Sequence, residues 1–295
     1  MTEEASGFLD VEALLESSEP RPGGTWLWYA AGAFLLLILV SSYLAGRSIA
    51  GPWLVELVST MSMMALVGGM GYMAWAGGRA VIREQQQVEA IEELVLLRRW
   101  SEAAEMLRRL LSRPARTPQA RVQSLVYLAS VLGRYHRWAD AITVYEYLLD
   151  LDVLDPDASY GLQLGRAMAM LHEDRLFDVD RVIGELRRQC EGRMPGGLAL
   201  VEIYRDVKTG HPQEAIELFE LHQEAMRRQL GMRVADAHAL VARAYDLVGR
   251  PVEAAAAYER ATLLAPEAEL LRRYAEVAAI AGKYAAAQRP ERQAA

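Results

Sequence analysis

The best-spaced group of chemically capable side chains is an acidic run, Asp150 to Asp157, which begins like a calcium loop. Carboxylates near the start of such a loop supply oxygen ligands to Ca²⁺. However, the run lacks the glycine that makes the sharp turn of a calcium loop, and Gly161 stands where a bidentate glutamate is required. We therefore predict an acidic connector that ends a helix, and no calcium site.

The histidines and the single cysteine do not form a pattern typical of catalysis or metal binding. No two of the five histidines are four residues apart, and none stands beside a paired acid. Cys190 alone provides neither an internal disulfide nor a cysteine-based zinc site. The chain also lacks a glycine-rich phosphate loop and a Ser/His/Asp set. We predict that the protein is not an enzyme and uses no cofactor, metal or small-molecule substrate.

The formal charge of −7 is unevenly distributed along the chain. Residues 1–24 form an acidic tail with six acids and one arginine, and residues 25–78 contain one charge of each sign. Residues 79–295 contain 30 bases and 32 acids. Nucleic-acid-binding domains usually carry a basic patch or stripe, so we expect no nucleic acid partner.

Two apolar segments, residues 25–46 and 53–77, are each long enough to cross a bilayer. A helix rises about 1.5 Å per residue, so about 20 residues cross a hydrocarbon core of roughly 30 Å. Aromatic residues stand near the segment ends, as they do at membrane–water interfaces. The connector of six residues predicts an antiparallel transmembrane hairpin. The acidic tail before it argues against a cleaved signal peptide.

Arginines near the hairpin predict its orientation. The connector contains only Arg47, whereas the other side has Arg21, Arg79, Arg83 and Arg98. Because cytoplasmic flanks are enriched in basic residues, we expect both termini and the following domain in the cytoplasm. Glu56, the one charge in the second segment, lies near its start. A position at headgroup depth is favoured over a proton-relay role, because an ion at mid-bilayer is costly.

Residues 237–266 contain a spaced pattern of small and aromatic residues, namely Ala242, Tyr245, Gly249, Ala254, Tyr258, Ala261 and Pro266. The pattern resembles the tetratricopeptide repeat (TPR), a helical hairpin of about 34 residues. In this family the small residues let the two helices cross closely, and the tyrosines fill the space between hairpins. Pro266 would end the second helix, because proline cannot continue the hydrogen-bond ladder.

Positions equivalent to Ala254 recur upstream at intervals of 36 to 39 residues, at Ala215, Phe177, Ala141 and Ala103. Ala129 and Tyr145 also match the pattern, whereas Asp206 occupies an apolar position. The resemblance implies an all-α fold in which residues 79–287 form an α-solenoid of about five repeats plus a capping helix. Residues 288–295 are expected to form a disordered tail.

In TPR proteins the concave surface that binds partners is lined mainly by first-helix side chains. Carried over residue by residue, the candidate groove residues are Glu92, Ser130, Arg134, Arg166, Tyr204, Lys208 and Arg243. The cations would form a mildly basic row suited to an acidic or amphipathic peptide, since arginine pairs bidentately with carboxylates. An ordinary solvated face is the alternative. The Lys/Asn clamp of chaperone-binding members of the family is not visible in this sequence.

Two local questions stay open at the level of sequence. The second apolar segment either continues as one helix into the first repeat or bends at Gly77 and Gly78. The N-terminal residues Phe8, Val11, Leu14 and Leu15 share one stripe of a possible helix. That helix would dock in a groove of this chain or of a partner, and disorder is equally compatible with its length and charge.

These features predict a membrane-anchored TPR scaffold that recruits a protein partner at the cytoplasmic membrane face, where tethering raises effective concentration. An accessory subunit of an envelope polysaccharide biosynthesis or secretion complex is the alternative. The layout is similar to that of the TPR-bearing membrane component of the Pel exopolysaccharide machinery, which also places repeats after two membrane helices. A transporter-associated subunit using Glu56 is a third possibility, but it would need more membrane helices.

Overall fold

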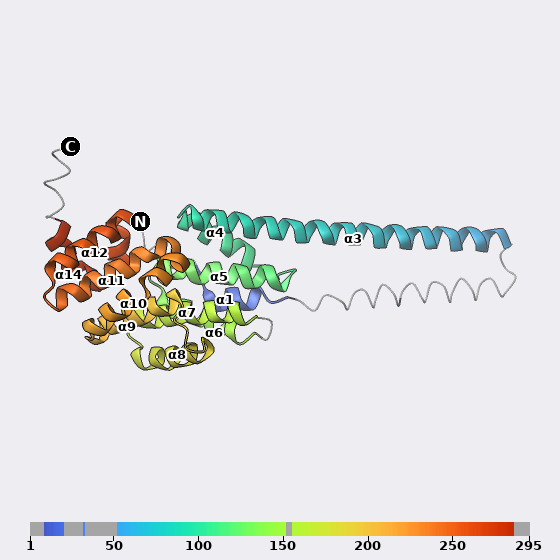
Figure 1. Cartoon of the computed structure of the whole chain (residues 1–295). Helices are drawn as coiled ribbons and strands as arrows, with labels where there is room; N and C mark the ends of the chain where they lie inside the picture. Colours follow the sequence, from blue (N-terminus) through green and yellow to red (C-terminus); the bar gives the residue numbers. More distant parts are fainter. Residues whose placement is uncertain (1–8, 21–31, 33–51, 152–154, 286–295) are drawn as a thin grey trace. The chain divides into compact units, whose positions relative to one another are not determined.

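The computed structural model describes residues 9–20, 32, 52–151 and 155–285, and their regular secondary structure is entirely helical (Figure 1). The predicted all-α class is confirmed, and the architecture is consistent with an α-solenoid.

The chain divides into two compact units, Met1–Val131 (unit 1) and Leu132–Ala295 (unit 2). The helices are α1 Val11–Ser17, α3 Pro52–Leu96, α4 Trp100–Leu111, α5 Pro118–Arg134, α6 Trp138–Leu149, α7 Pro156–His172, α8 Leu176–Gln189, α9 Gly196–Thr209, α10 Pro212–Leu230, α11 Val234–Leu247, α12 Pro251–Leu264, α13 Glu267–Arg273 and α14 Ala275–Ala285, with a 3₁₀ turn at Gly231–Arg233.

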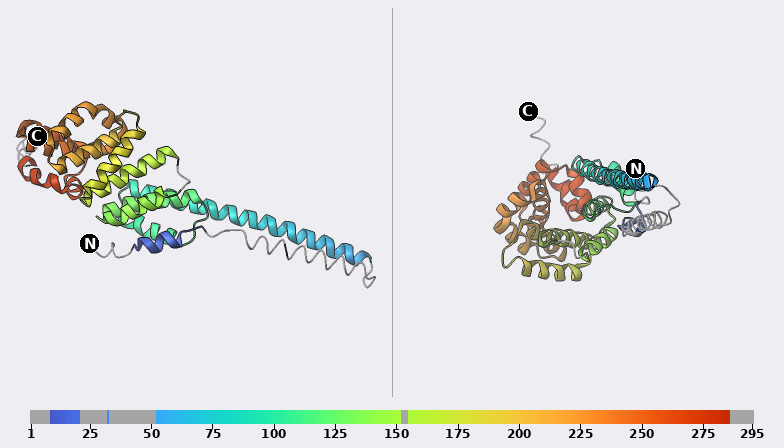
Figure 2. Two further views of the ribbon diagram at one scale, coloured as in Figure 1. Left: turned by 90° about the horizontal axis from the view of Figure 1, so that it is seen from below. Right: turned by 90° about the vertical axis from the view of Figure 1, so that its right-hand side faces the viewer.

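Unit 2 is a stack of helical hairpins (Figure 2). α9 packs against α10, and α11 packs against α12, as the two helices of one hairpin. The first helices of successive hairpins also contact one another, because α7 packs against α9, α9 against α11, and α11 against α14. This side-by-side order of first helices places one continuous set of side chains on the same face of the unit.

Five turns between consecutive helices share one backbone geometry. Each contains a residue with positive φ, at Arg98, His136, Asp174, Gly210 or Gly249. The backbone N–H of the next residue donates to a carbonyl oxygen five residues earlier, at 2.8 to 3.0 Å. This bond satisfies a carbonyl at the end of the first helix, as in a Schellman motif. The same turn conformation is therefore repeated five times in the described part of the chain.

A short ion pair follows four of these turns. The arginine before the second helix pairs with the acid three residues later, in Arg99–Glu102, Arg137–Asp140, Arg175–Asp178 and Arg250–Glu253, at 2.5 to 2.9 Å. Exposed pairs of this kind contribute little to stability. Their constant place beside the turn marks the start of α4, α6, α8 and α12.

The turns correct the register of the third repeat. In every repeat the fourth residue of the second helix is buried, namely Ala103, Ala141, Val179, Ala215 and Ala254. Phe177, which the spacing predicted for this place, is 84% exposed. The prediction was wrong by two residues, because α8 begins directly after the Asp174 turn and so brings Val179 to the helix crossing.

The other residues predicted for repeat packing have the following places. Ala129, Ala242, Ala261 and Tyr258 are buried, as is Tyr245, while Tyr145 is half-buried. Gly249 has a φ of 74° in its turn. Pro266 lies between α12, which ends at Leu264, and α13, which begins at Glu267.

α3 is continuous through Gly77 and Gly78, so the structure agrees with the one-helix alternative. Its last turns form the first helix of the first hairpin and pack against α4. The first predicted span, residues 25–46, lies outside the described residues apart from residue 32. Within the described part of the chain, no helix has both the length and the apolar character needed to cross a membrane.

The N-terminal segment packs against other helices of unit 1, within its own chain. Leu9, Val11, Leu14 and Leu15 are buried, and α1 packs against α4. Arg121 of α5 donates from Nη2 to the Leu15 carbonyl at 2.9 Å and from Nε to Ser18 Oγ at 3.1 Å. Of the predicted alternatives, docking within the chain is the one observed for residues 9–20, whereas Phe8 lies outside the described residues.

The predicted capping helix at 267–287 is interrupted. α13 and α14 are separated by Tyr274, whose φ of −126° and ψ of 100° are those of an extended residue. This conformation turns the Tyr274 ring into the interior of unit 2, where it is fully buried. The tail at 288–295 lies outside the described residues.

Candidate partner-binding groove

Unit 2 contains a cavity of about 700 Å³, here called the unit-2 groove. Its walls come from the first helices α9 and α11, the turns after α5 and α7, and the α13–α14 segment. The side chains that give it its chemistry are His136, Trp138, His172, Tyr204, Lys208, Arg243, Leu247, Arg272, Arg273 and Glu276.

A row of stacked rings runs through the groove. The indole of Trp138 stacks on the His172 imidazole, with ring centroids 4.0 Å apart and planes 8° apart. Tyr204 lies 5.2 Å from His172 and meets Tyr274 edge-to-face at 5.1 Å. These rings come from four separate helices or turns, so they hold α6, α7, α9 and the α13–α14 segment together. Trp138, His172 and Tyr204 line the groove, whereas the buried Tyr274 packs against Tyr204.

The cations of the groove are largely paired. Lys208 Nζ donates to the Leu171 carbonyl at 2.6 Å and to Asp174 Oδ1 at 2.5 Å, with Glu276 at 3.5 Å. Arg243 pairs with Asp246 at 3.2 Å. The predicted basic row is therefore partly neutralised by acids that the repeat pattern does not identify.

Arg272 differs from the other groove cations. Its side chain is exposed, and it has no ion-pair partner among the described residues. It also lies close enough to His136 to help burial lower the pKa of that imidazole. At the rim around His136 and Arg272, a carboxylate from a partner would consequently form its most favourable ion pair with the groove.

His172 and Tyr204 form a hydrogen-bonded pair that stays uncharged. His172 Nδ1 lies 3.2 Å from the Tyr204 hydroxyl. Burial, assisted by the nearby Lys208 charge, lowers the pKa of His172 to about 3. Burial and the Glu276 carboxylate raise the pKa of Tyr204 above its ordinary value. Neither group exchanges a proton near neutral pH, so the pair suits recognition better than acid–base chemistry.

The lowered pKa of His172 predicts acid sensitivity. In the unfolded chain the imidazole titrates near 6.5 and then binds a proton that the folded state excludes. Stability is therefore complete above about pH 6.5 and falls as the pH decreases towards 3, by about 2 kcal/mol at pH 5. We expect urea unfolding at pH 7.5 and 5.0 to show this loss, and His172→Gln to reduce it. The same reduction in a His222→Gln control would contradict the assignment.

The structure brings together three of the seven predicted groove residues, since Tyr204, Lys208 and Arg243 all line the unit-2 groove. Arg134 and Arg166 are half-buried outside its lining, and Arg166 Nε is buried without a hydrogen-bond partner. Glu92 is half-buried and Ser130 is exposed, and both belong to unit 1.

Sequence reasoning predicted Tyr204 but missed the other three rings and Arg272. Trp138 and His172 stand at helix ends beside turns, at positions that the register of predicted groove residues does not include. The interruption of the helix at Tyr274 lets Arg272 line the groove and the buried Tyr274 ring pack against Tyr204. The signal in the sequence that could have identified these rings is the recurrence of aromatic and histidine residues beside the turns of successive repeats.

The misfit at Asp206 has a structural explanation. A second cavity of about 510 Å³ lies between α8, α9 and α10, and the buried carboxylates of Glu202 and Asp206 line it. Glu202 pairs with Arg187 at 2.6 Å, and Asp206 pairs with Arg205 at 2.7 Å. Burial nevertheless raises the pKa of Asp206. These ion pairs replace the apolar contact expected from the repeat.

The acidic run Asp150 to Asp157, predicted to be a connector and not a calcium site, lies between α6 and α7, and its residues 152–154 lie outside the described residues. Asp155 Oδ1 accepts the Ala158 N–H at 2.7 Å and so caps α7. In the part of the chain that the structure covers, no group of three or more histidine, cysteine or acidic residues is arranged to hold a metal ion.

Comparisons of the chain with protein-family models, with curated proteins and with solved structures found no match.

Proposed function

We propose that the protein is a membrane-anchored, TPR-like scaffold that holds a protein partner at the cytoplasmic membrane face without catalysing a reaction. The observation that carries this proposal is the unit-2 groove, which is lined by rings, an exposed arginine and the half-exposed Leu247. Concave sites with an apolar wall and a few polar groups are typical binding sites. Here the wall belongs to stacked first helices, where TPR proteins bind peptides.

The apolar character of residues 53–77 supports the membrane anchor. Several large side chains of this part of α3 are exposed, including Met61, Met64 and Tyr72 at 66%, 73% and 66%. An apolar surface of this kind usually marks contact with a partner or a membrane. The Arg79 guanidinium lies 4.0 Å above the Trp75 ring, and aromatic and basic residues of this sequence order are common at bilayer interfaces.

The docking of α1 supports a hairpin with both ends on one side. α1 and residues 84–96 of α3 belong to the same unit, and Ser18 and Glu84 line one small cavity. Residues 52–83 of α3 extend about 48 Å beyond Glu84 at about 1.5 Å per residue. The N-terminal segment and the repeats would therefore face the same compartment.

A crosslinked pulldown from membranes tests the proposal. The full chain is compared with a variant in which a short flexible linker replaces residues 22–80. A simple truncation to residues 79–295 is unsuitable, because it removes α1 and exposes the surface that α1 covers on unit 1. Recovery of the same soluble protein by both forms would support a binding module with a membrane anchor. Recovery of membrane proteins by the full chain alone would favour the envelope-complex alternative.

Groove variants locate the binding surface. The double substitution Leu247→Asp with Arg272→Glu changes two exposed side chains of the unit-2 groove. Leu263→Asp with Arg260→Glu makes the same changes on exposed positions of α12 outside the groove. We expect the first variant to lose the partner and the second to keep it. Equal recovery by both would overturn the groove as the binding site.

A further inference from the structure

Four exposed arginines lie where α3 leaves unit 1 towards its apolar segment. Arg79 and Arg83 stand on α3, and Arg113 and Arg116 stand in the loop between α4 and α5. None of the four has an ion-pair partner among the residues that the structure describes. We call these four residues the arginine cluster.

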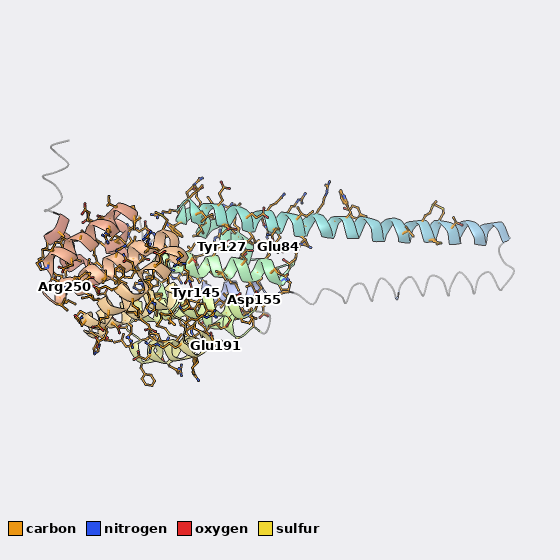
Figure 3. The ribbon with its side chains drawn as sticks, in the orientation of Figure 1. Glu84, Tyr127, Tyr145, Asp155, Glu191 and Arg250 are labelled. Carbon is orange, nitrogen blue, oxygen red and sulfur yellow. The ribbon has the colours of Figure 1, made fainter. Side chains whose placement is uncertain are left out.

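A set of hydrogen bonds holds the loop against α3. The Glu84 carboxylate accepts the backbone N–H of Arg116 at 2.9 Å and that of Thr117 at 3.1 Å, and the Thr117 hydroxyl lies 3.3 Å away. Arg113 and Glu84 line the same small cavity. Glu84, labelled in Figure 3, directly follows Arg83. These contacts bring Arg113 and Arg116 to the part of α3 that carries Arg83.

The cluster stays positive after its neighbours are counted. Glu84 is adjacent, but its oxygens are occupied by two N–H groups and a hydroxyl. Glu19 of the N-terminal segment is a second nearby acid, because the carbonyl of the preceding residue, Ser18, accepts the Ala115 N–H at 3.1 Å. Four cations against two acids is a local excess of positive charge in a chain whose formal charge is −7.

On α3 the cluster continues into a membrane-interface pattern. Trp75, Arg79 and Arg83 are spaced four residues apart and so lie along one side of the helix. Trp75 belongs to the apolar segment 53–77 and is 54% exposed, and the two arginines directly follow that segment. Arg79 and Arg83 thus lie within two turns of the predicted end of the apolar segment at residue 77, which is headgroup depth in the proposed anchor.

We propose that the arginine cluster binds the phosphate groups of anionic lipids at the membrane surface. This inference rests on the proposed membrane anchor. Guanidinium groups form bidentate, charge-assisted hydrogen bonds with phosphate oxygens. Each basic residue near an anionic bilayer surface contributes about 1 kcal/mol. Binding at this place would set the depth of α3 and hold unit 1 against the headgroups.

Native mass spectrometry of the full chain in a non-ionic detergent tests the proposal. The protein is titrated with dioleoylphosphatidylglycerol or with dioleoylphosphatidylcholine, which differ in headgroup charge. We expect the wild type to bind phosphatidylglycerol more tightly, and Arg113→Gln with Arg116→Gln to lose about thirtyfold in that affinity. The matched control is Arg193→Gln with Arg260→Gln, two exposed arginines of unit 2, which should change nothing.

Three results would overturn the inference. The first is equal affinity of the wild type for the two lipids, and the second is an unchanged preference in Arg113→Gln with Arg116→Gln. The third is competition by free glycerol phosphate at the lipid concentration, which would indicate a site for soluble phosphate. Flotation with phosphatidylcholine vesicles separates this inference from the proposed function. A chain that floats without preferring phosphatidylglycerol refutes only the lipid site, and one that does not float refutes the membrane anchor as well.

Discussion

Replacing Arg273 with methionine is expected to destabilise unit 2 by about 3 kcal/mol. The Arg273 guanidinium pairs with Asp236 at 2.5 Å and with Glu269 at 2.7 Å, and the Asp236 side chain is 1% exposed. The substitution leaves the Asp236 carboxylate buried, and its remaining ion pair among the described residues is the one with Arg233 at 3.6 Å. Removing one member of a buried pair costs more than the pair contributes, because the remaining charge is desolvated without a partner.

Removing the second charge should recover most of this loss. We expect Asp236→Asn combined with Arg273→Met to restore more than half of the lost stability, since a neutral amide is less costly to bury than a carboxylate. The control is Arg228→Met, at an arginine whose side chain is 74% exposed. Hydrogen exchange of α11 amides measures the change within unit 2. A loss of under 1 kcal/mol in Arg273→Met, or no recovery in the double variant, would show that water reaches Asp236.

Gly196→Ala is expected to destabilise unit 2 by about 2 to 3 kcal/mol. A Cβ atom at Gly196 would lie 2.8 Å from the Met226 Cα and 3.1 Å from the Ala225 carbonyl oxygen. These are backbone atoms of α10, so no side-chain rotation relieves the overlap. The Gly196 N–H also donates to Gln229 Oε1 at 2.6 Å and would be displaced with the helix.

Gly184→Ala is the matched control for this substitution. Gly184 lies inside α8, and a Cβ built there would have no neighbour within 4 Å apart from the adjacent residues and the backbone of its own helix. Alanine is favoured over glycine in a helix interior by roughly 0.5 to 1 kcal/mol, so this variant should be slightly more stable than the wild type. Thermal unfolding of the two variants gives shifts of opposite sign if the close approach of α9 and α10 is as described. Equal shifts would mean that α10 moves away at little cost.

The helical class and much of the repeat pattern follow from local features of the sequence. Ala242, Gly249 and Ala254 could be identified because a small side chain at a helix crossing and a glycine in a tight turn are local requirements. The error at Phe177 has the complementary reason. His136 and Asp174 adopt the positive φ that glycine adopts at the same place in other turns, so no residue type marked the third turn.

Only the tertiary structure decided which side chains meet. Tyr274 reaches His172 and Tyr204, Arg121 reaches α1, and the loop carrying Arg113 is bonded to Glu84. Each of these contacts joins residues more than thirty positions apart, and no local spacing encodes them. The sequence by itself therefore determined the apolar segments and the hairpins that could form. The groove, the docked N-terminus and the arginine cluster depend on how those hairpins pack, because a long-range contact is set by the fit of whole helices.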